Sequence, residues 1–327
     1  MHLAEVLPAH LAGRHVLVLP AGTDVRTLAQ AWFPGATWER RPTDPADTPV
    51  VARPTGARFR GIVAEAPRPT TGVLRLDAAT AVDGPVLVDE ATSRALGLGA
   101  RELDAWVLVA DDGGPAGPGG VAPADGAAAG GVPVPGLHDL ALGWTVAAAR
   151  RAAGAVLPSD GSRVVAPDPA SAVDLTLWSA VPLAPQDVVP LVRPAFGGAR
   201  IGPTDVPQPA VSDPGAQPFS LAATFEYDGV VTVRAARARE VPLVLSTVDQ
   251  RQYGTWAYHV VWQPPDPSEL HVEHPSQLHV IARSRVSPSV ARVTATLWRV
   301  AGGTVVDSGG FAVPPEELAE RARTDLR

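Results

Sequence analysis

The sequence predicts an α+β protein made of two similar halves, each a mostly antiparallel β-sheet with helices on one face, in the style of the ferredoxin fold. Three observations predict this class: two pairs of matching segments in the same order along the chain, a series of strands in the second half, and a helix near the end of each half. The 327 residues are enough for one large domain or two ordinary ones. Two separate domains and one fused sheet both fit this pattern.

Two pairs of segments indicate an internal duplication. Residues 24–36 match residues 187–199 at six of thirteen positions, and residues 152–167 match residues 300–315 at five of sixteen. Because both pairs keep the same order, duplication is favoured over chance similarity in a chain rich in Ala, Gly and Val.

The alignment also predicts which residues occupy the same place in the two halves. Asp24 aligns with Asp187, and Gly154 aligns with Gly302. We expect the two glycines at equivalent helix C-termini, where a residue without Cβ permits left-handed backbone.

The strands of the second half have the clearest local signals. Residues 219–227 and 230–236 flank Asp228-Gly229, a two-residue turn typical of β-hairpins. Further strands are expected at residues 241–247, 255–262 and 277–284.

A helix is expected to close each half. In the second half Ser287 is a candidate N-cap, Pro288 suits the first helical position, and Gly302 with Gly303 would end the helix. Apolar residues at helical spacing form one stripe on it: Val290, Val293, Leu297 and Val300. The counterpart in the first half is expected at residues 137–152.

A stretch rich in Gly, Ala and Pro interrupts the first half. Residues 111–136 have no apolar periodicity, so we expect a flexible loop or linker. The first half then consists of residues 1–110 with 137–167, and the second half of residues 168–315. A helix is expected at residues 316–327, directly after Pro314 and Pro315.

Composition excludes several classes of chemistry. The chain contains no Cys, which excludes disulfides and thiol nucleophiles, and no Lys, which excludes Schiff-base chemistry on lysine. The net charge of −7 disfavours a nucleic-acid partner, and no apolar run is long enough for a membrane span. No secretory signal is legible, so a cytoplasmic location is expected, and no cofactor is predicted. The absence of Lys and Asn is typical of a GC-rich bacterial genome.

An aromatic row on one expected strand is the strongest candidate for a ligand site. In residues 250–263, three aromatic side chains alternate onto the same face. They form either part of the core under the closing helix or a partly open platform for a planar or sugar-like ligand. The candidate platform consists of Trp256, Tyr258 and Trp262, with Arg251 and Tyr253 at its rim.

A histidine-rich connection is a second candidate. The segment 269–279 carries three histidines and Glu273, and His259 lies on the preceding strand. Imidazole and carboxylate groups are common ligands of divalent metals, but this spacing matches no rigid motif, so a solvated loop is favoured. The candidate ligands are His271, His274 and His279.

The segment Asp307 to Gly310 is a third candidate, because a carboxylate beside a glycine turn could bind a cation. A similar segment at residues 159–162 favours turn chemistry in both halves.

These observations favour a non-catalytic module that binds a partner protein or small ligand through its second half. The alternative is a metal-assisted hydrolase that uses residues 259–279. The spacing identifies no nucleophile–base pair, so no catalytic residue is assigned, and the oligomeric state stays open.

Overall fold

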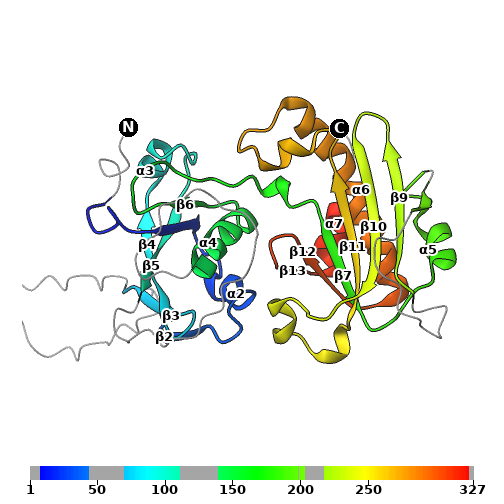
Figure 1. Ribbon diagram of the computed structural model, residues 1–327. Coiled ribbons are helices and arrows are strands. Elements are labelled where there is room, and N and C mark those ends of the chain that lie inside the picture. The colour runs from blue at the N-terminus through cyan, green and yellow to red at the C-terminus, as the bar shows by residue number, and fades with distance from the viewer. Residues whose placement is uncertain (1–7, 44–69, 111–138, 198, 203–216, 324–327) are drawn as a thin grey trace, which may run out of the picture. The chain divides into compact units, whose positions relative to one another are not determined.

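Two antiparallel sheets organise the chain in a computed structural model, which describes residues 8–43, 70–110, 139–197, 199–202 and 217–323 (Figure 1). The chain divides into a first unit, residues 1–29 with 35–166, and a second unit, residues 30–34 with 167–327. The sheets have six and seven strands, which confirms the α+β class. The expected loop at residues 111–136 lies outside the described residues. No helix in the described ranges is long and apolar enough to cross a membrane.

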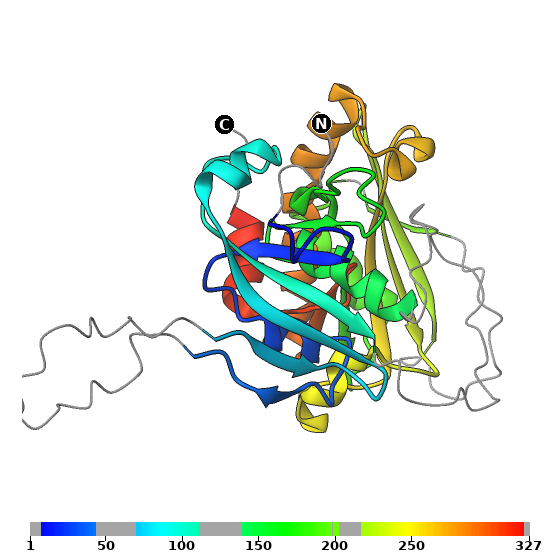
Figure 2. The same ribbon diagram turned by 90° about the vertical axis from the view of Figure 1, so that its left-hand side faces the viewer.

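The first unit has six strands in the order β2-β3-β4-β5-β1-β6, each antiparallel to its neighbours. The long strands β4 and β5 lie side by side near the middle of this sheet (Figure 2). The elements of the unit, in chain order, are β1 (Val16–Pro20), α2 (Val25–Gln30), β2 (Thr37–Arg40), β3 (Gly72–Arg75), β4 (Thr80–Val88), α3 (Glu90–Ala95), β5 (Leu103–Ala110), α4 (Asp139–Arg151) and β6 (Ala155–Leu157).

The second unit has seven strands in the order β13-β12-β7-β11-β10-β9-β8, again all antiparallel. Its elements, in chain order, are β7 (Leu175–Ser179), α5 (Pro185–Val192), β8 (Arg200–Gly202), β9 (Phe219–Phe225), β10 (Gly229–Arg237), β11 (Trp256–Gln263), α6 (Gln277–Ala301), β12 (Thr304–Asp307), β13 (Ala312–Val313) and α7 (Pro315–Arg323). Short 3-10 turns lie at Pro169–Ser171, Leu243–Thr247, Gln250–Gln252 and Pro267–His271.

The two sheets place their strands in the same order. In each unit the first strand lies between the fifth and the sixth, and the fifth is followed by the fourth, third and second. The ferredoxin style is not confirmed, because that fold has a β-α-β-β-α-β order, whereas each unit here has two more strands between its helices.

Two expected strands are wrong, and the closing helix begins earlier than predicted. Residues 243–247 form a 3-10 turn, and residues 277–284 are the first turns of α6. The side chain of Ser276 caps this helix by accepting the backbone N–H of His279 at 3.2 Å. Pro288 therefore lies inside α6 rather than at its start. A proline there costs about 3 kcal/mol, which the long buried stripe of α6 offsets.

The hairpin between β9 and β10 also differs in detail from the prediction. Its connection is residues 226–228, with Tyr227 in the left-handed region at φ 76°, instead of the predicted Asp228-Gly229 turn. The strands themselves lie close to where the sequence places them.

The core of the second unit lies between its sheet and α6. Fully buried side chains from β7, β10 and β11 pack in one cluster with those of α6. Helices α5 and α7 both contact α6, so the three form one layer, called here the helix layer (Figure 1). This arrangement fixes which face of α6 is buried and which is available to a partner.

Candidate functional site

The aromatic row of β11 is part of the core. The exposed fractions of Trp256, Tyr258 and Trp262 are 9%, 0% and 3%. His279, in the first turn of α6, packs on Trp262 with 5.0 Å between the ring centroids. The platform interpretation required an open ring face, and the extra turns at the start of α6 help to cover that face. The structure therefore places the row in the position that the core interpretation describes.

The polar atoms of the row are satisfied by the protein itself. The Tyr258 hydroxyl donates to the carbonyl of Val181 at 2.7 Å and accepts from the N–H of Leu183 at 2.8 Å. The Trp262 indole donates to the carbonyl of Asp228 at 2.8 Å. Burial raises the pKa of Tyr258 to about 12, so this hydroxyl keeps its proton at neutral pH. These bonds fix loops to the sheet.

The two rim residues of the predicted platform lie beyond the start of β11. Arg251 is exposed in a 3-10 turn, where its backbone N–H is capped by Asp249, and Tyr253 follows that turn half-buried. Neither residue completes a site with the covered row.

The candidate metal ligands whose side chains are described do not form a metal site. His259 points to the sheet face opposite Tyr258, where its Nδ1 lies 3.0 Å from the Thr176 hydroxyl. His279 is buried in the first turn of α6, and His274 is exposed on the preceding loop, while the His271 side chain lies outside the description. Within the described ranges no group of three or more His, Cys, Asp or Glu could hold a metal ion. Burial lowers the pKa of His259 and of His279, so both imidazoles are neutral near pH 7.

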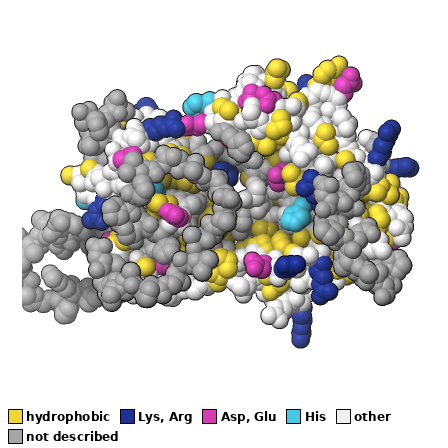
Figure 3. All heavy atoms as spheres, in the orientation of Figure 1, with side chains coloured by type: hydrophobic (Ala, Val, Ile, Leu, Met, Phe, Trp, Pro, Cys, Tyr) yellow, Lys and Arg dark blue, Asp and Glu magenta, His cyan; other side chains and the backbone are white. Residues whose placement is uncertain are grey.

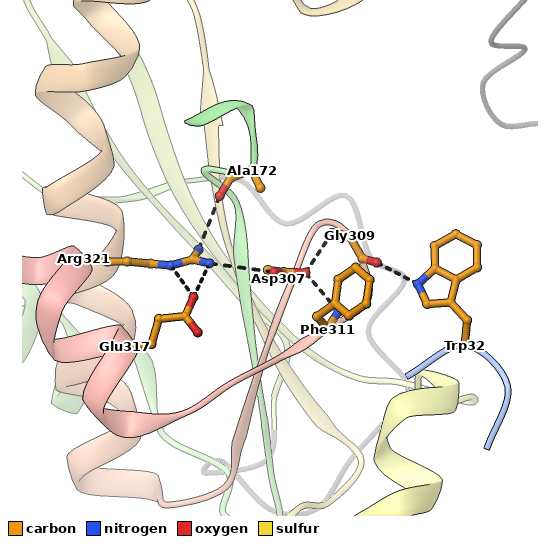
Figure 4. A network of polar contacts seen from close by, with 7 residues as sticks. All are labelled: Trp32, Ala172, Asp307, Gly309, Phe311, Glu317 and Arg321. Carbon is orange, nitrogen blue, oxygen red and sulfur yellow. Dashed lines mark hydrogen bonds and ion pairs between the residues drawn. The ribbon is translucent and has the colours of Figure 1, made fainter. Parts of the chain in front are cut away.

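Asp307 ties the β12–β13 hairpin to neighbouring segments of its unit (Figure 4). Its Oδ1 accepts the backbone N–H groups of Gly309 at 2.9 Å and Phe311 at 3.0 Å. Arg321 of α7 lies 3.8 Å from its Oδ2 and also binds Glu317 at 2.7 Å. The carbonyl of Gly309 accepts the Trp32 indole N–H at 2.9 Å. A carboxylate held by so many protein groups fits the turn interpretation.

The outer face of α6 carries a row of arginines. This helix of 25 residues contains four Arg and no Asp or Glu, in a chain whose net charge is −7. Arg285, Arg292 and Arg299 are exposed, whereas Arg283 is buried and paired with Asp168. Seven residues are almost two helical turns, so the three exposed side chains lie on one face, about 10 Å apart along the helix. We call these three residues the arginine row.

An apolar groove runs beside the C-terminal half of the arginine row. It lies between α5 and α6 and has a volume of about 480 Å³. Val300 in its wall is 50% exposed. The lining residues are Leu191, Pro194, Ala195, Arg292, Thr296, Arg299 and Val300.

The groove is basic as well as apolar. Arg292 donates to the carbonyl of Ala322 at 2.9 Å, and Arg299 donates to the carbonyl of Ala295 at 3.1 Å. Neither takes part in any ion pair of the described residues, and none of the described lining residues carries a carboxylate. In the view of Figure 3, by contrast, acidic and basic side chains are interspersed on the described surface.

The arginine row was not predicted from the sequence, although the regular spacing of its residues can be seen there. The spacing of seven between three arginines, without any intervening acid, predicts a basic helical face once residues 277–301 are known to be one helix. Because the expected helix began at Ser287, Arg285 fell outside it.

The fold and this surface define an α+β protein of two antiparallel-sheet units with a basic, grooved helix layer on the second. None of the protein-family models, curated proteins or solved structures compared with the chain matches it.

Proposed function

We propose that the protein is a non-catalytic interaction module that binds a partner protein through the helix layer of its second unit. One observation carries this proposal: an apolar groove is flanked by two exposed guanidinium groups that have no carboxylate partner among the described residues. Protein interfaces combine an apolar centre with a polar rim and are enriched in arginine. The groove has both features.

The lining of the groove favours binding over catalysis. Its described lining offers two guanidinium groups and one threonine hydroxyl beside apolar side chains, with no carboxylate or imidazole among those residues to act as a general base. Arginine stays protonated at physiological pH and cannot take that role. The metal-assisted alternative has no support among the described residues, because no group of three or more His, Cys, Asp or Glu among them could hold a metal ion.

We further infer that the two units arose by duplication. The shared strand order supports this, and so does the burial of aligned positions. Three aligned pairs are buried in both units: Val25 with Val188, Ala29 with Val192, and Ala36 with Ala199.

The contacts of the glycines after α4 and α6 also support the duplication, but they shift the alignment of these glycines by one residue. A Cβ on Gly154 would lie 2.2 Å from the carbonyl oxygen of Val18, and a Cβ on Gly303 would lie 2.2 Å from that of Trp178. These contacts favour Gly303 over Gly302 as the equivalent of Gly154.

Site-specific crosslinking tests the proposed function. A photoreactive amino acid replaces Val300 in the groove, and a matched control carries it at Leu87, which is exposed in the first unit. In cells of the source organism we expect one defined protein adduct from position 300, absent from position 87, and lost when Arg292→Glu is added. Absence of such an adduct, or the same adducts from both positions, would contradict the proposal.

A further inference from the structure

We infer that the partner docks an acidic, amphipathic α-helix along α6, with its carboxylates repeated every seventh residue. This inference rests on the proposed function and names the chemistry of the partner. It follows from the spacing of the arginine row and from the groove beside it.

The spacing of the arginines selects a helix as the partner element. A second helix packed along α6 at about 8–10 Å repeats its own faces with the same rise of about 1.5 Å per residue. Carboxylates at every seventh position of that helix would each meet one guanidinium of Arg285, Arg292 and Arg299. Flanking charges pair in this way along coiled coils, where they set partner choice and orientation.

The groove supplies the apolar half of the contact. Leu191 and Ala195 on one side and Val300 on the other leave an apolar trough beside Arg292 and Arg299. Apolar side chains of an amphipathic helix would fill it, while its carboxylates reach the arginines at the rim. An acidic segment without an apolar face would leave this trough open to water.

The three arginines differ in their existing partners, so we expect them to contribute unequally to binding. Arg285 already lies 3.6 Å from the carboxylate of Asp228, so a partner carboxylate there competes with an existing one. Among the described residues, Arg292 and Arg299 have backbone and hydroxyl partners only. We therefore expect Arg292 and Arg299 to contribute more to binding than Arg285.

A protein helix fits this surface better than a nucleic acid does. The phosphates of one strand are about 3.4 Å apart along a duplex, so a row with a spacing of about 10 Å would meet only every third one. The apolar trough also has no role in binding phosphates.

Two designed peptides of about 20 residues test the inference. Both form helices with the same leucine stripe, and they differ only at every seventh position on the flank, which is Glu in one and Gln in the other. Fluorescence anisotropy with the full chain should show the Glu peptide binding about tenfold more tightly at low salt. The difference should shrink at high salt, because exposed ion pairs are screened.

Variants of the chain identify the site. Arg299→Gln is the cleanest variant, because its hydrogen bonds lie within α6, and it should weaken binding of the Glu peptide about fivefold with no effect on the Gln peptide. Arg292→Gln should act similarly, and Arg285→Gln less. Arg239→Gln, an exposed arginine outside the helix layer, is the matched control and should change nothing. Circular dichroism melts verify that each variant is folded.

The outcomes separate the inference from the proposed function. If the two peptides bind equally and Val300→Asp removes both, the groove binds helices, but the acidic partner is wrong. If neither peptide binds, or if a single-stranded DNA of equal charge binds more tightly than the Glu peptide, the acidic helix is again wrong. In these cases the crosslink at position 300 still decides the proposed function.

Discussion

Helices α4 and α6 occupy the same place in their units and differ most on their outer faces. Each joins the fifth strand of its sheet to the sixth and packs on the first strand, which lies between those two. Helix α4 has 13 residues and carries its arginines, Arg150 and Arg151, only in the last turn. Helix α6 has 25 residues and an arginine row along its length. The difference indicates that the sheet constrains the inner faces alike and leaves the outer faces free to differ.

The inner faces of the two units are correspondingly similar. Leu17 in β1 pairs with Trp106 in β5, and Leu177 in β7 pairs with Tyr258 in β11. All four side chains are buried, so a large aromatic residue stands at the same place in both sheets. A difference in function is therefore expected from surfaces such as the groove rather than from these cores.

Truncating the central leucines should give the largest effect. Leu17 and Leu177 are both 0% exposed at equivalent register positions. Leu17→Ala and Leu177→Ala should each lower the free energy of unfolding by about 3–5 kcal/mol, because each leaves a cavity. Urea unfolding followed by tryptophan fluorescence measures both. A difference of more than about 2 kcal/mol between the two would argue against equivalent cores.

Adding a methyl group at the equivalent glycines should give the next largest effect. Gly154→Ala and Gly303→Ala both force a backbone carbonyl to move, since the new Cβ would lie 2.2 Å from it. We expect each to cost about 2–3 kcal/mol. Gly302→Ala is the comparison: the space there is open, but φ of 62° with ψ of −170° is a backbone conformation essentially confined to glycine, so strain alone should cost about 1–3 kcal/mol. A much smaller cost for Gly303→Ala than for Gly154→Ala would contradict the equivalence of those two positions.

Removing the Tyr258 hydroxyl should have a smaller, pH-dependent effect. Tyr258→Phe leaves the N–H of Leu183 and the carbonyl of Val181 without this partner, which should cost about 1–3 kcal/mol. Tyr253→Phe is the control, because that residue is only half-buried, and it should be nearly neutral.

The stabilisation that the Tyr258 hydroxyl contributes should decrease as the pH rises. Burial raises its pKa to about 12 in the folded chain, above the value of about 10 for an exposed tyrosine. The unfolded chain therefore loses this proton first, and the stabilisation declines between about pH 10 and pH 12. Thermal melts across this range should show a steeper decline for the parent chain than for Tyr258→Phe. Equal declines would contradict the assignment.

Several elements were predictable because their signals are local. Alternating residues and turn residues place β9 and β10, and Gly302 ends α6 where the sequence suggests. The start of α6 was not predictable in this way, since Ser287 followed by Pro288 has the pattern of a helix N-terminus. That pattern is overridden here by the burial of a longer stripe.

The candidate site was harder to predict because burial is a tertiary property. Alternation along β11 correctly puts Trp256, Tyr258 and Trp262 on one face, but it cannot say whether that face is covered. Their burial depends on α6, whose early turns carry His279. The arginine row, by contrast, can be predicted from its spacing in the sequence. It was not predicted because the expected helix began too late to include Arg285.

Substituting the two aligned aspartates, Asp24 and Asp187, should give the smallest effects, because only Asp24 caps a helix. Asp24 directly precedes α2 and accepts the backbone N–H groups of Arg26 at 3.1 Å and Thr27 at 3.2 Å, as a helix cap does. Asp187 lies inside the first turn of α5, where Ala184 holds the cap position. Asp24→Ala should cost about 1 kcal/mol, whereas Asp187→Ala loses only a helix-dipole interaction of about 0.3 kcal/mol.

The effect of Asp24 should also depend on pH. The hydrogen bond from the Thr27 side chain is the largest cause that lowers the pKa of the Asp24 carboxyl in the folded chain. The stabilisation by Asp24 is therefore present above the pKa of about 4 that an unfolded aspartate has, and it is lost as the pH falls below that value. Urea unfolding of both variants at pH 7 and pH 3 tests this, with a difference between them expected at pH 7 and a smaller one at pH 3. Equal costs at both pH values would mean that the two aspartates act alike, and that the second unit also uses its aspartate as a cap.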